Sequence, residues 1–320
     1  MNFWRHRRVL ITGANGYLGT ELAKTLIEKG ALVFGFDASA QGGISNLGLD
    51  KEVKLIVGSL RDLELVEKVL TENEIQTCFH LAGQSGVSAS QELPLLAFES
   101  NIMATWVLLE ACRRYNQVSQ IVVASSNHIY GEQDVMPTSE DLPLKGLGTY
   151  GVSKACADMI ARCYAKTYSL PVTIARITNT YGGFDPHKDH IITNTIISVL
   201  KNESPIIKSD GKSEKGYLHI VDTVNAFLTL AEKMSVVDIK GEAFNFYPDE
   251  SISVLDLVRK IIQVSGKTHI EPMTLGKPRK ENEIDREHLS NQKAKRLLGW
   301  QPKHSLEVGL RQTIGLYSKT

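Results

Sequence analysis

The stretch TGANGYLG, residues 12–19, constrains the fold of this chain more than any other feature. It places Gly13, Gly16 and Gly19 between an apolar strand pattern and an amphipathic helix pattern. Glycines at this spacing permit a tight turn, close approach of a pyrophosphate to the backbone, and close packing of the helix on the strand. The helix N-terminus adds unpaired N–H groups and the positive end of the helix dipole. The stretch therefore predicts a dinucleotide site at the first strand–helix turn.

The second expected strand, residues 31–37, ends in Asp37. An acid at this position accepts hydrogen bonds from the ribose hydroxyls of NAD and repels the 2′-phosphate of NADP. The following residues, Ala38 and Ser39, provide no arginine that could hold that phosphate. We therefore predict NAD as the cofactor.

Further apolar strand patterns alternate with helical ones along the chain. Strands are expected at residues 53–58, 77–83, 120–126 and 171–177, and helices at 94–115, 149–168, 191–201, 221–233 and 253–265. This alternation predicts βαβ units with right-handed crossovers. We expect an α/β fold, a Rossmann-type doubly wound parallel sheet with a smaller C-terminal substrate-binding lid. Residues 1–182 would form mainly the NAD-binding domain and 183–320 mainly the lid, with some segments returning to the core.

Composition excludes several other functions. Lys plus Arg and Asp plus Glu each total 36, so no net charge recruits nucleic acid or an anionic membrane. The cysteines Cys78, Cys112, Cys156 and Cys163 lack metal-ligand spacing, so we expect buried thiols, a reducing compartment and no metal site. Neither a signal peptide nor a run of membrane-spanning length is recognised, which predicts a cytoplasmic protein without a membrane partner.

A candidate catalytic group follows in the middle of the chain. Tyr150 and Lys154 lie at i and i+4 of an expected helix, on the same face. A nearby ammonium and a bound nicotinamide cation both stabilise phenolate, so Tyr150 could act as a base. Such a pair is common on helix surfaces by chance. Ser126, at the end of an expected parallel strand, strengthens the interpretation because its hydroxyl could share a substrate hydroxyl with Tyr150.

These features occur in order with four further motifs: HLAGQ (80–84), Asn101, SSNHIYG (125–131) and RITNTYGG (176–183). As a set they resemble the extended short-chain dehydrogenase/reductase family of nucleotide-sugar epimerases and dehydratases, over nearly the whole chain. FWRHRRVLITG, LLEACRR and YGVSKACADMIA most resemble CDP-glucose 4,6-dehydratases. The resemblance implies an NAD-dependent nucleotide-sugar enzyme, a CDP-hexose as a candidate substrate, and a homodimer packed through helices around 97–115 and 150–168.

The implied reaction begins at C4 of a hexose. Tyr150, assisted by Ser126, takes the proton of the 4-hydroxyl while hydride passes from C4 to NAD. Dehydratases then use the two residues after the serine or threonine, which in CDP-glucose dehydratases are an acid and a lysine. This chain has Asn127 and His128 there. An amide is a poor proton donor, whereas a histidine could be the C5 base or a residue that only binds substrate or backbone.

An epimerase needs neither residue to be ionisable. The sequence therefore favours epimerisation. The alternatives are 4,6-dehydration with His128 as base, and an inactive NAD-binding sensor or scaffold.

The expected residues form three overlapping groups. The catalytic group is Ser126, Asn127, His128, Tyr150 and Lys154. The resemblance implies a cofactor group of Gly13, Asn15, Gly16, Tyr17, Leu18, Gly19, Asp37, Leu60, Leu81, Ala82, Gln84, Asn101, Tyr150 and Lys154. It implies a substrate group of Ser126, Asn127, His128, Asn179, His190, Lys215, Lys280 and Glu283. Ser59 stands where the family has an aspartate near the adenine, and Asp62 is the candidate substitute.

Overall fold

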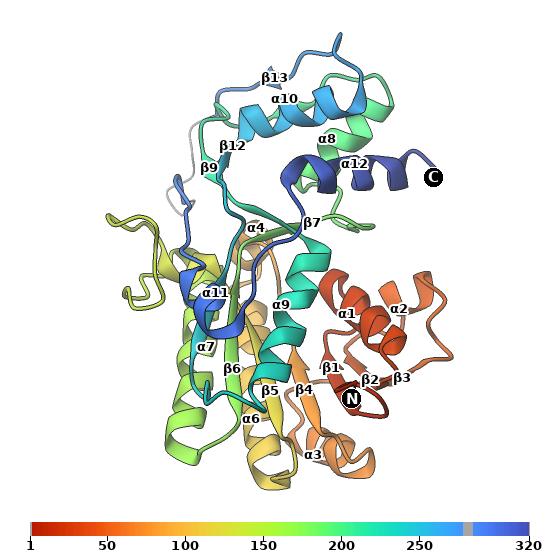
Figure 1. Cartoon of the computed structure of the whole chain (residues 1–320), viewed down its shortest axis with the longest axis vertical. Coiled ribbons are helices and arrows are strands. Elements are labelled where there is room, and N and C mark those ends of the chain that lie inside the picture. Colours follow the sequence, from red (N-terminus) through yellow and green to blue (C-terminus); the bar gives the residue numbers. More distant parts are fainter. Residues whose placement is uncertain (1, 278–283, 320) are drawn as a thin grey trace.

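The computed structural model describes residues 2–277 and 284–319. Its centre is a seven-stranded, fully parallel sheet with the order β11-β6-β5-β4-β1-β2-β3 (Figure 1). The strands are β1 (Arg8–Thr12), β2 (Leu32–Asp37), β3 (Val53–Val57), β4 (Thr77–His80), β5 (Gln120–Ser126), β6 (Val172–Ile177) and β11 (Ala243–Phe246). The structure confirms the predicted parallel sheet, with strand ends within a few residues of those expected.

The strand order places a switch point between β1 and β4. The chain runs outward from β1 to β3, then returns to lay β4 along the other side of β1. Helices that follow β1 and β4 therefore leave the sheet in opposite directions, and a crevice opens beyond the carboxyl ends of these strands. The predicted glycine turn lies at this edge, directly after β1.

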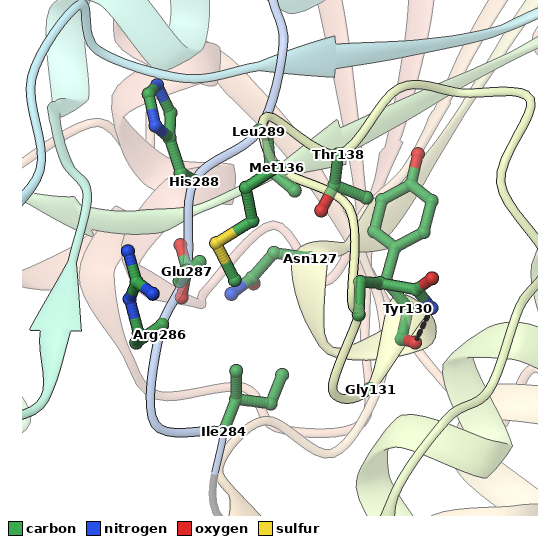
Figure 2. A pocket seen from close by; sticks show the side chains of 11 residues that line it. Asn127, Tyr130, Gly131, Met136, Thr138, Ile284, Arg286, Glu287, His288 and Leu289 are labelled. Carbon is green, nitrogen blue, oxygen red and sulfur yellow. Dashed lines mark hydrogen bonds between the residues drawn. The ribbon is translucent and has the colours of Figure 1, made fainter.

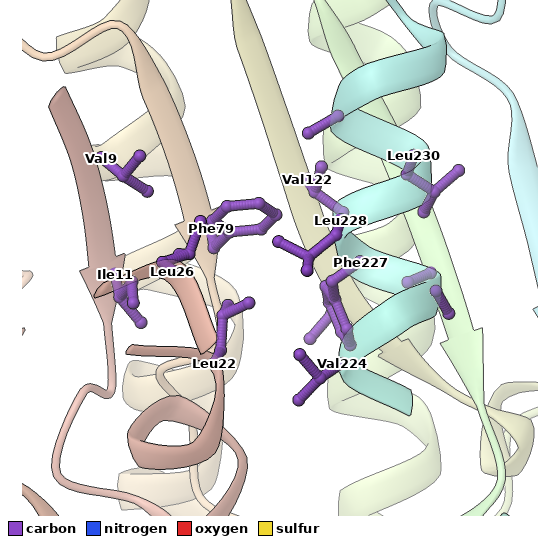
Figure 3. Close-up of a cluster of buried hydrophobic side chains, with 14 of the residues drawn as sticks. Val9, Ile11, Leu22, Leu26, Phe79, Val122, Val224, Phe227, Leu228 and Leu230 are labelled. Carbon is purple, nitrogen blue, oxygen red and sulfur yellow. The ribbon is translucent and has the colours of Figure 1, made fainter. Parts of the chain in front are cut away.

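Helices cover both faces of the sheet. One face carries α1 (Tyr17–Glu28), α9 (Ile220–Lys233) and α11 (Gln292–Leu298), and the other carries α3 (Leu63–Glu72), α6 (Ala104–Tyr115) and α7 (Gly148–Tyr168). Neighbouring strand residues alternate between these faces, as the pleat requires. Phe79 of β4 and Phe227 of α9 meet in the first core with their ring centroids 6.4 Å apart (Figure 3). Each such buried aromatic contributes about 1.5–3 kcal/mol to folding through burial.

The helix expected at residues 94–115 is interrupted. The structure divides it into α5 (Pro94–Phe98), a π-helical turn η1 (Glu99–Met103) and α6. This segment is, by length and a mean hydropathy of 1.3, long and apolar enough to cross a membrane, so the expectation that no run reaches that length is wrong. Half of its most apolar window (50%) is buried, and α6 packs between α3 and α7. A core helix passes the same test of length and apolarity.

The lid is a separate layer above the carboxyl ends of the strands (Figure 1). Its helices are α8 (Ile191–Leu200), α10 (Val254–Ser265) and α12 (Leu306–Tyr317), in good agreement with two of the expected segments. Short strands pair as β7 (Asn179–Tyr181) with β10 (Tyr217–His219), β9 (Glu214–Lys215) with β12 (Ile252–Ser253), and β8 (Ile206–Ile207) with β13 (Met273–Thr274). The remaining short elements are α2 (Gly43–Asn46), α4 (Val87–Glu92) and η2 (Asn127–Tyr130).

The second half of the chain contributes to both layers. α9, β11 and α11 pack in the sheet domain, while the helices of the lid bury Ile196, Leu257 and Leu310 in a core of their own.

The four cysteines are free thiols, but their burial differs from the expectation. Cys78 and Cys112 are buried, Cys156 is half-buried and Cys163 is exposed. Cys156 and Cys163 both lie on α7, on the parts of its surface that do not pack against the sheet.

Candidate active site

The glycine turn after β1 leaves no room for side chains. Gly13 has φ of +72°, and a Cβ there would lie 2.8 Å from the backbone nitrogen of Ala82. A Cβ on Gly19 would lie 2.1 Å from the Gly13 carbonyl oxygen, so α1 can begin this close to β1 only with glycine at that position. Gly16 is the N-cap of α1. The turn thus forms a bare backbone cradle at a helix N-terminus, and its residues fit a pyrophosphate.

Asp37 organises this cradle. Its carboxylate accepts hydrogen bonds from the backbone N–H groups of Asn15 (2.9 Å) and Ser39 (3.1 Å). The Asn15 side chain in turn donates to the Ser39 carbonyl oxygen at 2.7 Å. A carboxylate has about four lone-pair positions, so Asp37 retains capacity for ribose hydroxyls. The residues present at this edge therefore fit a dinucleotide with an unphosphorylated ribose.

The other expected cofactor residues surround the cradle in different ways. Tyr17 donates its hydroxyl proton to the Gly182 carbonyl oxygen and ties α1 to the start of the lid. Leu18 and Leu81 pack against the core under the turn. Leu60 is buried, and Ala82 lies against Gly13.

Ser59 and Asp62, the residues considered for the adenine contact, both make local hydrogen bonds at the start of α3. Asp62 is the N-cap of α3 and accepts from the backbone N–H of Leu65, so its carboxylate has a structural role. Ser59 Oγ accepts from the backbone N–H and Nε of Arg61.

Asn101 lies inside the π-helical turn and is buried. Its amide donates to Ser153 Oγ at 2.8 Å and to the Gln84 carbonyl oxygen at 3.2 Å. It therefore links the HLAGQ segment to α7, one residue before Lys154. π-helical turns often occur at functional sites because the extra residue redirects a side chain. The sequence indicated Asn101 by motif but gave no sign of the altered helix that positions it.

Ser126, Tyr150 and Lys154 gather at the carboxyl end of β5. Lys154 donates to the Ala124 carbonyl oxygen at 3.0 Å, and burial lowers the pKa of its ammonium to about 8. Burial also raises the pKa of Tyr150, while a hydrogen bond with Ser126 lowers it in part. The lysine remains largely protonated at neutral pH and provides the nearby positive charge that favours phenolate.

Asn127 and His128 begin η2, directly after Ser126. Ser126 Oγ donates to Asn127 Oδ1 at 3.0 Å and accepts from the backbone N–H of His128 at 3.3 Å. The His128 ring packs edge-on against Tyr150 with centroids 5.4 Å apart. Burial, reinforced by the positive charge of Lys215, lowers the pKa of His128 to about 4. His128 is therefore neutral at physiological pH and available as a proton acceptor.

The expected substrate residues take up separate positions. Asn179 donates to the Gly216 carbonyl oxygen at 3.2 Å, and Lys215 donates to the Ile284 carbonyl oxygen at 2.8 Å. His190 is the N-cap of α8, where its Nδ1 lies 2.6 Å from Asp185 and its side chain is half-exposed. Lys280 and Glu283 lie outside the described residues.

Two buried residues to which the sequence assigned no individual role accompany this group. His80 is held between Thr12 (2.8 Å) and Thr105 (3.0 Å), and burial lowers its pKa to about 3. Glu287, three residues after Ile284, is 4% exposed and lines a small cavity with Asn127 (Figure 2). No motif or periodicity marks Glu287, because the contact that gives it meaning joins segments far apart in the sequence.

A surface group of His187, Asp189 and His190 lies in the loop before α8. Their ligand atoms are within 4.8 Å of one another, and all three residues are exposed. The sequence prediction of no metal site considered only the spacing of the cysteines, so it did not detect this group.

The fold and the site define a dinucleotide-binding α/β protein of the Rossmann type, with Ser126, Tyr150 and Lys154 gathered at the carboxyl end of β5. The chain matches the model of the GDP-mannose 4,6 dehydratase family over residues 10–313 and belongs to that family. Its relatives include NAD-dependent nucleotide-sugar epimerases and 4,6-dehydratases.

The relatives represent both activities. The chain is 30% identical to the UDP-glucose 4-epimerase of Bacillus subtilis over 327 residues, covering 93% of each chain. It is 27% identical to the CDP-glucose 4,6-dehydratase of Salmonella typhimurium over 330 residues, covering 98% of this chain and 90% of that one.

Solved structures show the same pair of activities. UDP-glucose 4-epimerase from Thermotoga maritima with UDP-glucose superimposes with a TM-score of 0.89 at 29% identity, covering 98% of this chain and 99% of that one. The dTDP-glucose 4,6-dehydratase of Bacillus anthracis in complex with NAD gives 0.85 at 26% identity, covering 98% and 97%.

Proposed function

We propose that this protein binds NAD and oxidises C4 of a nucleotide-linked hexose to a 4-ketosugar. One observation carries this proposal. Ser126, Tyr150 and Lys154 gather in the same site as the glycine cradle, whose backbone is hydrogen-bonded to Asp37. NAD, when bound there, supplies the acceptor for the C4 hydride. Tyr150 takes the 4-hydroxyl proton, Ser126 orients that hydroxyl, and Lys154 stabilises the phenolate.

The residues around Asn127 support two outcomes for the ketosugar. Epimerisation, favoured by the sequence, requires only that the sugar turns over and hydride returns to C4. Asn127 is consistent with it because its amide binds a hydroxyl without exchanging a proton. Dehydration is the second candidate, and one observation favours it: Glu287 brings a buried carboxyl group to Asn127.

A panel of nucleotide sugars tests the proposal. Purified protein is incubated with UDP-, dTDP-, GDP- and CDP-glucose, and products are separated by chromatography and identified by mass. A C4-inverted hexose or a 4-keto-6-deoxyhexose is the expected result. The absence of product and of reduced nicotinamide with every substrate would contradict the proposed activity and favour the sensor or scaffold alternative.

We also infer that the active form is a homodimer packed through α5, α6 and α7. These helices contact one another, yet their outer faces expose Leu95 (77%), Met159 (60%) and Trp106 (43%). Large apolar side chains exposed on neighbouring helices are typical of interaction surfaces.

Sedimentation velocity tests the dimer. The wild-type protein is expected to sediment as a dimer and Met159→Lys as a monomer. Val236→Lys changes an even more exposed apolar residue (76%), which lies on a turn outside these helices, and should not change the mass. A monomeric wild type at micromolar concentration would contradict it.

A further inference from the structure

Glu287 is a buried acid that the oxidation step does not use. It lies in the segment after Ile284, which runs past the carboxyl ends of β5 and β6. Its side chain is 4% exposed, and Oε2 makes no hydrogen bond of good geometry within residues 2–277 and 284–319. A buried carboxyl group with one oxygen so weakly paired is unfavourable for stability alone, so the position calls for a functional explanation.

The carboxyl group of Glu287 points toward Asn127, whose amide is a poor proton donor. Figure 2 shows the Asn127 amide nitrogen directed across the small cavity toward Glu287. That nitrogen forms no hydrogen bond of good geometry with a described residue, but it lies close enough to Glu287 to lower the pKa of the carboxyl group in part. Since Asn127 directly follows Ser126 and its Oδ1 accepts from Ser126 Oγ, Glu287 is separated from the oxidation group only by this amide.

The contacts of Thr178 are compatible with a proton on Glu287. Thr178 Oγ lies 3.1 Å from the Gly216 carbonyl oxygen and also contacts Glu287 Oε1. The hydroxyl has a single proton, and a carbonyl oxygen can only accept. Both contacts are favourable together when Thr178 donates to Gly216 and Glu287 donates to Thr178.

Charge and burial agree with this arrangement. Burial raises the pKa of Glu287, and this effect is the largest; the charge of Lys215 and hydrogen bonding with Thr178, Asn127 and the Gly216 backbone oppose the rise. The same lysine lies near His128, where its charge adds to burial in keeping the imidazole neutral. The sugar side of the site therefore combines a carboxyl group whose pKa is raised by burial with a neutral imidazole, on either side of Asn127. Two titratable groups whose environments favour opposite roles indicate an acid and a base.

We propose that Glu287 is the proton donor of the sugar site, supplying the acid that Asn127 lacks, and that with His128 as base it directs the 4-ketosugar to 4,6-dehydration. The inference rests on the proposed C4 oxidation and names the step that follows it.

The elimination balances with these residues. His128 accepts the C5 proton, the C5–H electron pair forms the C5–C6 double bond, and the C6–O bond breaks. The oxygen takes the Glu287 proton and leaves as water. Hydride removed from C4 is returned to C6, and the proton on His128 returns to C5, so no net oxidation occurs. Tyr150 has then gained one proton and Glu287 has lost one, and transfer of a single proton through solvent restores the site.

The experiment compares the wild type with Glu287→Gln, which keeps the shape of the side chain and removes its acidity. Each protein is mixed with UDP-, dTDP-, GDP- and CDP-glucose. Reduced nicotinamide is followed by absorbance, and sugar products by mass. The wild type is expected to give a 4-keto-6-deoxyhexose. The variant is expected to form reduced nicotinamide at the wild-type rate but to lose water about 10²- to 10⁴-fold more slowly.

A double variant separates proton donation from structure. Adding Asn127→Asp to Glu287→Gln places an acid back in the cavity and should restore water loss. Infrared difference spectra between the substrate-free wild type and each substrate-free variant provide a second readout. The carbonyl stretch of a protonated carboxylic acid at neutral pH is expected in the wild type and not in Glu287→Gln, while Glu214→Gln, at an exposed neighbouring acid, should keep it.

Three outcomes overturn the inference and leave C4 oxidation standing: undiminished water loss in Glu287→Gln, equal loss of C4 oxidation and water loss in that variant, or a wild type that yields only a C4-inverted hexose. Absence of reduced nicotinamide in the wild type with every substrate overturns the proposed function, and this inference with it.

Discussion

The cofactor end and the sugar end of this site are constructed differently. The cofactor end comes from consecutive segments: a glycine turn between β1 and α1, and Asp37 at the end of the next strand. The sugar end joins distant ones, since Glu287 contacts Thr178, which lies 109 residues earlier, and approaches Asn127 from the opposite wall of the cavity. Local sequence therefore determines the cofactor end, whereas tertiary packing determines the chemistry of the sugar end.

Substitution of Tyr150, the proposed base of C4 oxidation, should have the largest effect on turnover. Tyr150→Phe removes the phenol that accepts the 4-hydroxyl proton, so C4 oxidation is expected to fall about 10²- to 10⁴-fold. NAD affinity, measured by calorimetry, should change little, because the glycine cradle is untouched. Tyr168→Phe, at the exposed end of the same helix, is the matched control. Equal turnover in the wild type and Tyr150→Phe would mean that another group is the base.

The frame that holds the sugar end together should be the next most sensitive. Arg176 of β6 pairs with Asp158 of α7 through two 2.9 Å contacts, with both side chains at 0% exposure, and also donates to Tyr130 at 2.8 Å. Arg176→Met leaves Asp158 as an uncompensated buried charge. The free energy of unfolding should fall by about 3–5 kcal/mol in denaturant titrations.

The control for this prediction is Arg113→Met, which removes an exposed ion pair with Glu110 on α6. Its unfolding midpoint should shift far less than that of Arg176→Met. Similar shifts in the two variants would show that the buried network does not hold α7 against β6.

The cofactor end can be tested with two glycines of similar conformation. Gly13 and Gly48 have φ of +72° and +68°, but only Gly13 has backbone atoms within 3 Å of an added Cβ. Both alanine variants carry the cost of a left-handed residue, about 1–2 kcal/mol. Gly13→Ala should lose additional stability and most NAD affinity, whereas Gly48→Ala should bind NAD normally. Equal NAD affinity in both variants would contradict the cradle.

The pH dependence of turnover should give the smallest and most specific signal. His128 has a pKa of about 4, so it stays neutral on acidification, and turnover should be flat between about pH 5 and 7. Lys154 has a pKa of about 8, so the ammonium is lost as pH rises through that value and turnover should decline there. A fall in the wild-type rate centred in the ordinary histidine range, and removed in His128→Asn, would contradict the buried neutral imidazole.

The sequence predicted most of the fold and indicated the candidate oxidation residues because both signals are local. Alternating strand and helix patterns located β5 at residues 120–126, as observed, and the glycine turn identified its own partner in Asp37. The π-helical turn around Asn101 was missed, because its residues have ordinary helical patterning. Glu287 was missed for a different reason: a single acid in a polar stretch resembles a solvated surface charge until packing buries it.

The pKa of His128 shows that the chemistry of a residue also depends on tertiary packing, which local sequence does not reveal. A histidine in a sequence is expected to titrate near pH 6.5. The structure buries this ring beside Tyr150 and near Lys215, so its proton affinity drops and its role as a base becomes independent of pH over the physiological range. The residue was identified from sequence, but its environment was not.

The most direct test of the account follows deuterium placed at C4 of the nucleotide-linked glucose that the protein turns over. Removal of hydride at C4, followed by elimination with Glu287 as donor, predicts a 4-keto-6-deoxyhexose with the deuterium on C6. Deuterium recovered on an inverted C4 would retain the oxidation step and contradict the role of Glu287. A product formed with deuterium still on C4 in its original configuration would contradict C4 oxidation, the central claim, altogether.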